Sequence, residues 1–216
     1  MKPDRMTIEE TLGLAATRLA GKGLLKPGDT LSQRIPEQNA MVLTRIKAGQ
    51  DVSEEFLWSP LTGSSTDLHQ AIYTARPDVG AIAAGQFTWT SMLTRLDLTM
   101  PPIFDEQIRQ LGVETRRVGR RSTDGGAFPA LQNGANGYCL DDVSICLGMG
   151  LERLLLNIEI LEKSAESFVL AASAGLKVRR IPWLIKYIAN GRLKRDQKDA
   201  AARHLRGERS IMKAGY

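Results

Sequence analysis

Histidine is the scarcest of the residues that could do chemistry in this sequence. The 216 residues include two histidines, His69 and His204. A zinc site with three imidazole ligands therefore cannot form within one chain. His69 follows Asp67 by two positions, a spacing that does not place both side chains on one face of a helix. Two interpretations of His69 stay open: a buried structural histidine, or an acid, base or metal ligand.

A second group of reactive side chains lies in segment 104–112. Asp105, Glu106 and Arg109 fall on one turn of an expected helix. Asp105 and Arg109 are four residues apart, so a helical ion pair is one explanation for them. The other explanation is that these side chains line the mouth of a site. Together with His69, they are the candidate catalytic residues.

Cysteine content and hydropathy bound the cellular setting. The two cysteines, Cys139 and Cys146, cannot build a disulfide framework, which favours a reducing compartment. The first residues carry no apolar signal segment, and no apolar run approaches the roughly 20 residues of a membrane span. We therefore expect a cytoplasmic protein without a membrane span.

The spacing of apolar residues predicts short strands among amphipathic helices. Thr7, with Glu10 three residues later, has the pattern of a helix-capping box. We expect helices over 7–22, 64–76, 87–96, 104–111, 149–174, 182–189 and 193–206. We expect strands over 30–35, 40–46, 55–58, 79–84, 113–118, 127–133 and 138–140. This mixture indicates an α/β chain with one main body.

Residues 64–84, SSTDLHQAIYTARPDVGAIAA, resemble the class II aldolase and adducin N-terminal domain family. In that family, a Ser-Ser-Glu turn opens a helix that ends in His-x-x-Ile-Tyr-x-x-Arg-Pro-Asp. The segments LAATRLAGKGLL and LQNGANGYCLDDVSICLGMGLERLLLNIEILEK resemble the family's first helix and its closing strands with the last long helix. The resemblance covers about residues 8–170. It implies a three-layer α/β/α sandwich with a mostly antiparallel central sheet, and a homo-oligomer, in the family a cyclic tetramer with sites between subunits.

The metal positions of this family are replaced. The family's enzymes hold a divalent ion with three histidines, two in a His-x-His motif after the buried strand and one in Asn-His-Gly. By resemblance, Ala84 and Gln86 stand at the first two positions, and Gly134, after Asn133, at the third. Alanine and glycine side chains have no donor atom, and a neutral amide is a poor ligand for such an ion. We expect no metal and no other cofactor.

The remaining family machinery departs in the same way. Ser65 or Thr66 stands where the family has its acid/base glutamate, and residues 28–31 replace the phosphate-binding Thr-Ser-Gly-Asn. Class II aldol chemistry needs a Lewis acid for the enediolate. The resemblance therefore implies a pseudoenzyme that binds a small ligand or a partner. The expected ligand-binding residues are Ser64, Ser65, Gln86 and Asn133. The alternative is a metal-independent lyase, isomerase or other enzyme acting on a small hydroxylated or carbonyl substrate in the same inter-subunit cleft.

Positive charge is concentrated at the C-terminal end. The chain carries a net charge of +5, made up of +9 in residues 176–216 and −4 in the rest. We expect an aldolase-like domain over 1–175 and a helical, docked extension over 176–216. The residues expected to anchor it are apolar: Ile181, Trp183, Leu184, Ile185, Tyr187 and Ile188. Docking on the same chain or on a neighbour stays open. Binding of nucleic acid or an anionic membrane by this extension is the least favoured hypothesis.

Overall fold

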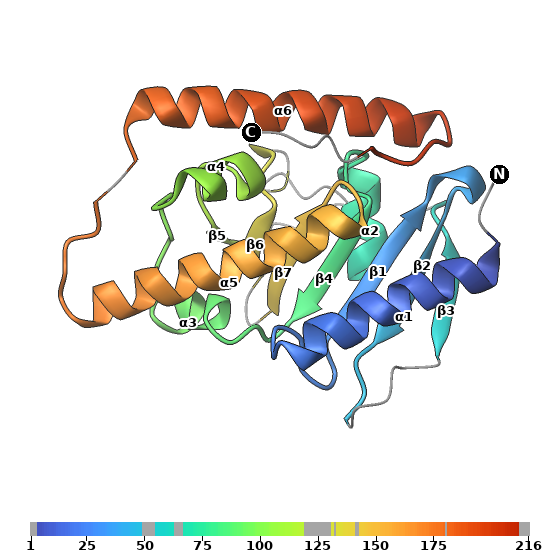
Figure 1. The fold of residues 1–216 in the computed structure, drawn as a ribbon, viewed down its shortest axis with the longest axis horizontal. Coiled ribbons are helices and arrows are strands. Elements are labelled where there is room, and N and C mark those ends of the chain that lie inside the picture. Colours follow the sequence, from blue (N-terminus) through green and yellow to red (C-terminus); the bar gives the residue numbers. More distant parts are fainter. Residues whose placement is uncertain are drawn as a thin grey trace.

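A seven-stranded sheet forms the centre of the described part of the molecule (Figure 1). The computed structural model describes residues 4–48, 55–62, 67–118, 131, 133–140, 143–179 and 181–211. The strands are β1 (Thr30–Ile35), β2 (Ala40–Arg45), β3 (Phe56–Pro60), β4 (Ala81–Gly85), β5 (Arg116–Val118), β6 (Gly137–Leu140) and β7 (Val143–Gly148). Their order is β3-β2-β1-β4-β7-β6-β5. Every pair is antiparallel except β5 and β6, which are parallel.

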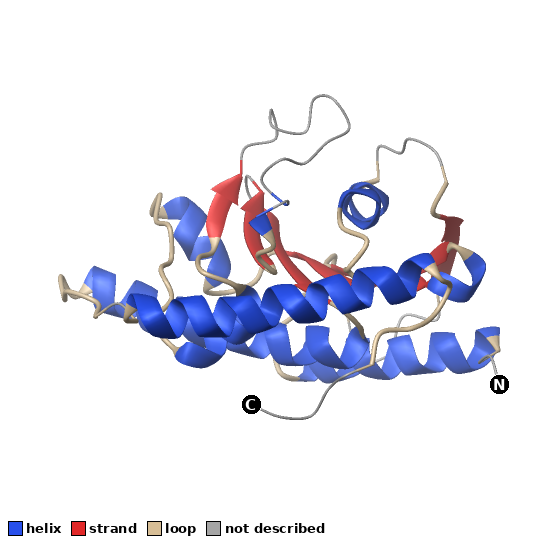
Figure 2. Ribbon diagram, turned by 90° about the horizontal axis from the view of Figure 1, so that it is seen from above, coloured by secondary structure: helices blue, strands red, loops and turns tan. Residues whose placement is uncertain are grey.

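Helices cover both faces of this sheet (Figure 2). They are α1 (Arg5–Gly21), α2 (Leu68–Ala75), α3 (Thr90–Arg95), α4 (Asp105–Leu111), α5 (Leu151–Ser173) and α6 (Trp183–Leu205), with a short 3₁₀ turn, η1 (Pro36–Gln38). α1 and α5 pack on one face and α2 on the other. The predicted α/β/α sandwich with a mostly antiparallel sheet is confirmed.

Strand β4 shows why its sequence is apolar without alternation. Ala81 and Ala83 face the core beneath α1 and α5, whereas Ile82 and Ala84 face the core beneath α2. Successive strand residues point to opposite faces, so a strand covered on both sides needs apolar residues at every position. The central place of β4 in the sheet follows from this pattern.

Several expected helix bounds are wrong, among them the start of α3, which is Thr90 and not residue 87. Helix α1 begins at Arg5, because the carboxylate of Asp4 caps it by accepting a 2.8 Å hydrogen bond from the Thr7 backbone N–H. Thr7 therefore lies inside the first turn and is not the cap residue. In the tail, one continuous helix, α6, replaces the two that were expected, and it runs through Gly191. Of the expected strand over 127–133, residues 127–130 and 132 lie outside the described residues.

The tail docks on its own chain through the second half of α6, whereas the sequence favoured the more apolar first half. In the second half of α6, Leu193, Gln197, Ala200 and His204 are buried. In the first half, Trp183 is 76% exposed and Tyr187 75% exposed. The expectation that these apolar side chains anchor the tail to the body is therefore wrong for a single chain. None of the helices in the described residues is both long and apolar enough to span a membrane.

Candidate functional site

A cavity of about 430 Å³ opens beside the N-terminal end of α2, and we name it the α2 cleft. It lies where β1 begins and β4 ends, because Thr30 pairs with Ala84 across these antiparallel strands. Strand register also places Arg45 opposite Thr30 and Ile145 opposite Ala84. Its described lining includes Thr30, Arg45, Ser59, Asp67, His69 and Ala84. Ala84, which by resemblance stands at the first of the family's three metal positions, thus lies in this cleft.

His69 forms part of the cleft wall and is almost fully buried. Its Nε2 atom lies 2.9 Å from the hydroxyl of Thr30, and its Nδ1 atom lies 2.7 Å from the hydroxyl of Ser32. The Ser32 hydroxyl is also 2.9 Å from the phenol oxygen of Tyr73. Both ring nitrogens are therefore engaged by protein groups.

The surrounding bonds fix the tautomer of this imidazole. Thr30 donates its only hydroxyl proton to the carbonyl oxygen of Ala84, 3.1 Å away, so it accepts from the Nε2–H of His69. Nδ1 then accepts from Ser32, which accepts from Tyr73. Burial lowers the pKa of His69 to about 4, an effect that Asp67 opposes and Arg45 reinforces. The ring is neutral near pH 7, as the structural interpretation of His69 requires.

Asp29 controls where β4 ends, and sequence analysis missed it. Its buried carboxylate accepts from the backbone N–H of Lys26 at 2.8 Å and of Gln86 at 2.9 Å. A Cβ atom on Gly85 would lie 2.1 Å from this carboxylate, so only glycine fits there. The glycine directly before the second family metal position was the available signal. Gln86 itself is exposed, and it is not among the described residues that line the α2 cleft.

The Arg-Pro-Asp motif forms a cluster of buried hydrogen bonds at the C-terminal end of α2. Arg76 forms a bidentate pair with Asp78, with both nitrogen–oxygen distances at 2.7 Å. The same guanidinium donates to the backbone carbonyls of Leu131 at 3.0 Å and Ala135 at 2.9 Å, and to the side chain of Asn136. All these groups are buried. The motif therefore holds the late loop that carries the third family metal position.

Helix α6 covers that third position. Gly134 has a left-handed φ of +82°, and a Cβ there would lie 3.1 Å from Oε1 of Gln197. The Gln197 amide donates to the Gly134 carbonyl at 2.7 Å. Asn133 is exposed, and its side-chain oxygen accepts from the Ala135 N–H and the Tyr138 hydroxyl, each at 2.8 Å. Ser64 and Ser65, the other expected ligand-binding residues, lie outside the described residues.

The remaining catalytic candidates lie on α4, apart from His69. Helix α4 packs against α5 and α6, while His69 lines the α2 cleft. Arg109 is 2.6 Å from the carboxylate of Asp196 on α6, in place of the expected pair with Asp105. Asp105 accepts from the backbone N–H of Glu106 at 3.0 Å. The structure does not bring these three residues together with His69.

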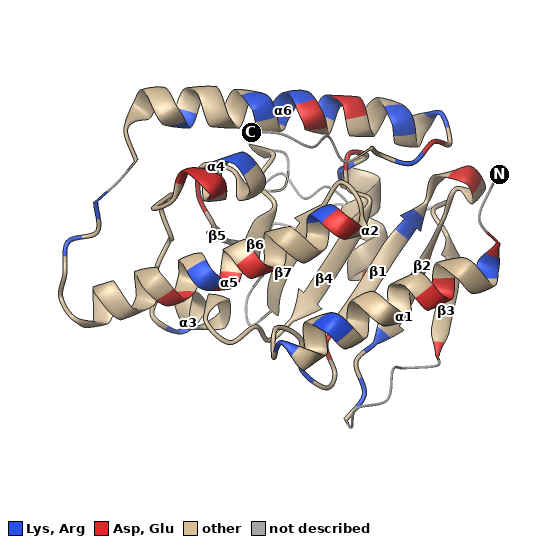
Figure 3. Ribbon diagram, viewed as in Figure 1, with Lys and Arg blue, Asp and Glu red and all other residues tan. Residues whose placement is uncertain are grey.

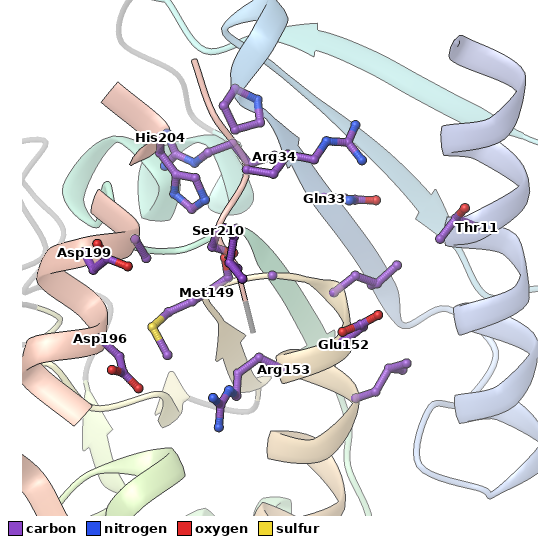
Figure 4. Close-up of a pocket in the computed structure, with 18 residues that line it drawn as sticks. Thr11, Gln33, Arg34, Met149, Glu152, Arg153, Asp196, Asp199, His204 and Ser210 are labelled. Atoms are coloured by element: carbon purple, nitrogen blue, oxygen red, sulfur yellow. The ribbon is translucent and has the colours of Figure 1, made fainter. Parts of the chain in front are cut away.

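A second cavity of about 350 Å³ lies at the other end of β1 (Figure 4), and we name it the tail cavity. Gln33, the first turn of α5, α6 and residues 209–211 contribute to its lining. Arg209 lies 2.8 Å from Glu37, and the Ser210 hydroxyl donates to the carbonyl of Met149. These two contacts hold the C-terminal segment across the cavity.

The residues at the family's metal positions do not fit a divalent ion. Ala84 presents a methyl group, and its carbonyl already accepts from Thr30. Gly134 offers no side chain, and its carbonyl accepts from Gln197. Among the described residues, no group of three His, Cys, Asp or Glu side chains is arranged to hold a metal. The donor chemistry of this cleft thus differs from that of a three-histidine site.

Comparisons with known proteins identify the fold. No family model and no curated protein matches the sequence. Among solved structures, an L-fuculose 1-phosphate aldolase aligns over 88% of this chain and 98% of its own, with a TM-score of 0.73 and 19% identity. YgbL from Klebsiella pneumoniae, titled a putative aldolase/epimerase/decarboxylase, aligns over 85% and 98%, with a TM-score of 0.70 and 18% identity.

A third solved structure extends the likeness into the tail. An aldolase II superfamily protein from Pseudomonas syringae aligns over 98% of this chain and 98% of its own, with a TM-score of 0.65 and 14% identity. A match over that share of the chain must include most of residues 176–216. At these identities the likeness concerns the fold alone.

Proposed function

On the class II aldolase fold that this chain adopts, we propose that the α2 cleft binds a small ligand without divalent-metal aldol chemistry. The observation that carries this proposal is Ala84 in the cleft floor. A class II aldol reaction needs a Lewis acid next to the substrate oxygens. A methyl group at 84 and a glycine at 134 supply no ligand for one.

The groups that line the cleft favour binding over proton transfer. His69 is neutral near pH 7 and has both ring nitrogens engaged. Arg45 is exposed, and within the described part of the chain its guanidinium donates one N–H to the carbonyl of Gly28, at 3.0 Å; its other N–H groups can bind an anionic group. Ser59 adds a hydroxyl. We propose that Ser64, Ser65, Gln86 and Asn133 contribute further contacts at the edges of this site.

The alternative is a metal-independent lyase or isomerase in the same cleft. It requires His69 to exchange a proton with a substrate, and therefore to give up its bond to Thr30 or Ser32. A general acid or base works best when its pKa lies near the working pH. A pKa of about 4 for a buried imidazole favours the ligand-binding function.

Metal analysis tests the proposal first. Protein incubated with excess Zn²⁺ and then dialysed should retain no stoichiometric metal in elemental analysis. About one tightly held ion per chain would overturn the proposal.

Ligand binding is the second test. A panel of sugar phosphates and hydroxy acids should include members that raise the melting temperature, with a smaller rise in Arg45→Gln. Arg95→Gln, an exposed arginine outside the cleft, is the matched control. If no member of the panel shifts the wild-type transition, ligand binding is contradicted. Turnover of a binding member, lost in His69→Gln, would favour the enzymatic alternative.

We also propose that the protein forms a homo-oligomer and acts in the cytoplasm, with residues 176–216 as an extension of the aldolase-like body. Cys139 and Cys146 support the reducing setting, because both are buried and not joined in a disulfide. Burial also raises the pKa of Cys146, which keeps its thiol protonated and unreactive.

A further inference from the structure

The largest group of exposed apolar side chains in the described residues lies on the first two turns of α6. Five of the six residues from 183 to 188 are apolar and exposed, and the sixth is Lys186. Their exposed fractions are Trp183 76%, Leu184 52%, Ile185 43%, Tyr187 75% and Ile188 50%. The second half of the same helix is docked on the body through Leu193, Gln197, Ala200 and His204. The body therefore holds these turns in place and leaves them uncovered.

Four of these side chains form one continuous face, which we name the α6 patch. Trp183 and Tyr187 are one helical turn apart, and so are Leu184 and Ile188. Residues at i, i+1, i+4 and i+5 span a stripe of roughly 140° on a helix. Ile185 lies at the border of this stripe. The patch thus has the shape of an apolar helix face that packs against a partner.

The area of the α6 patch is that of a small specific interface. At roughly 200 Å² for a fully exposed large side chain, the four exposed fractions correspond to about 500 Å² per chain. Two copies facing each other would bury on the order of 1,000 Å², which is the lower limit for a specific protein interface. Trp and Tyr are also the residues most enriched at the centres of such interfaces.

We propose that the α6 patch binds the α6 patch of a second copy of this chain, as a two-fold interface. The α6 patch can pair with the same patch of a second copy because none of its four side chains is charged. From residue 181 to 191, Lys186 is the only charged residue. Two such faces can meet without burying an ion in an apolar contact. This proposal does not depend on a ligand in the α2 cleft.

The distribution of charge argues against a membrane surface as the occupant. A helix that lies on an anionic membrane carries Lys and Arg along the polar side of its apolar stripe. In α6, the charges gather instead in the docked half, where Asp196 and Asp199 accompany the basic residues (Figure 3). Asp196 already pairs with Arg109 of the body. The exposed half carries one cation, Lys186, and not the row of cations that such binding uses.

Sedimentation equilibrium of the full chain between about 1 and 100 μM tests the interface. Wild type should associate. Trp183→Glu combined with Tyr187→Glu should raise the dissociation constant at least 100-fold, since the pairing would bury four carboxylates. Leu205→Glu is the matched control, because Leu205 is 78% exposed on the docked half of the same helix. Circular dichroism confirms that each variant is folded.

Cysteine cross-linking tests the pairing itself. Both native cysteines are buried, so an introduced surface cysteine is the reactive one. Tyr187→Cys should form a disulfide-linked dimer on mild oxidation, and Leu205→Cys should not. A monomeric wild type at 100 μM overturns the proposal, and so does a glutamate variant that associates like wild type. Binding of monomeric wild type to anionic phosphatidylserine vesicles would assign the patch to a membrane and equally overturn it.

Discussion

Helix α2 takes part in two buried polar clusters that differ in charge. At its end, Arg76 pairs with Asp78 and donates to the carbonyls of Leu131 and Ala135. Near its beginning, His69 links two hydroxyl groups without any ionic partner among its hydrogen bonds. The first cluster is ionic and closed. The second is neutral and forms part of the cleft wall.

The difference separates holding the fold from shaping the cleft. Removing one partner of a buried ion pair strongly destabilises the folded protein, because the other charge stays buried. The Arg76–Asp78 cluster therefore fixes one arrangement of the late loop. A neutral chain of hydrogen bonds orders the cleft wall without placing a full charge there. The cleft floor is therefore polar at Thr30 but carries no titrating group near pH 7.

The largest effect is expected where the charge is buried. Arg76→Ala should lower the free energy of unfolding by about 3–5 kcal/mol, because Asp78 would stay buried without its partner and three acceptors of the late loop would each lose a hydrogen bond. Urea denaturation measures the loss. Arg45→Gln, at an exposed arginine, should change stability by less than about 0.5 kcal/mol. Equal losses in the two variants would erase the distinction between the clusters.

Acid should act mainly on the neutral cluster. The pKa of His69 is lowered by burial from 6.5 to about 4 in the folded protein. Stability from this group is therefore complete above pH 6.5 and is lost as pH falls from 6.5 towards 4, by roughly 3 kcal/mol in total. Burial lowers the pKa of His204 as well, which adds to the loss in the same direction.

Denaturation between pH 4 and 8 measures this slope. His69→Gln should be less stable at pH 7 but show a shallower dependence on pH. Unchanged stability of wild type from pH 7 to pH 4.5 would contradict a neutral, buried His69.

Removing the central hydroxyl should have an intermediate effect. Ser32→Ala leaves the Tyr73 phenol and the His69 Nδ1 atom without their shared partner, so we expect a loss of about 1–3 kcal/mol. The control is Ser167→Ala, a partly exposed serine that donates to the carbonyl of Lys163 in its own helix. Thermal or chemical denaturation compares the two. A loss in Ser32→Ala no greater than in the control would show that the chain of bonds does not order the cleft wall.

The smallest expected effect is that of Arg45, on the surface of the α2 cleft, on the pKa of His69. Arg45 is one of the charges that keep the pKa of His69 low. Arg45→Gln should therefore raise that pKa, by less than about one unit because the guanidinium is exposed to water. Two histidines give few signals, so NMR titration of the imidazole protons can follow His69 directly. A decrease of the pKa would show that Arg45 stabilises the protonated ring.

Local sequence patterns predicted an element well where turn residues mark both of its ends. β1 has the expected bounds, since its strand residues stand between Gly28 and the turn at Pro36. The Arg-Pro-Asp motif was visible, but its role was not. Besides Asp78, the partners of Arg76 in the late loop lie 55 to 60 residues further along the chain, and no local pattern indicates them.

The docking of the tail could not be read from hydropathy. Apolar content favoured its first half, whereas specific polar contacts decided the outcome. Asp196 meets Arg109 across 87 positions, and His204 donates to the Pro77 carbonyl across 127 positions. For the candidate site, the sequence indicated Ala84. The state of His69 depends on Thr30 and Ser32, which lie nearly 40 positions before it.

The backbone conformation of Gly134 limits the order in which substitutions can be tolerated in evolution. A side chain at this position would occupy a left-handed backbone conformation, at a cost of about 1–2 kcal/mol, and would meet Gln197 of α6. A histidine introduced there is thus unfavourable until α6 also changes. The two positions are epistatic: the order in which substitutions occur decides which are tolerated. Single substitutions are therefore a poor route from this chain to a three-histidine metal site, even with histidines already placed at 84 and 86.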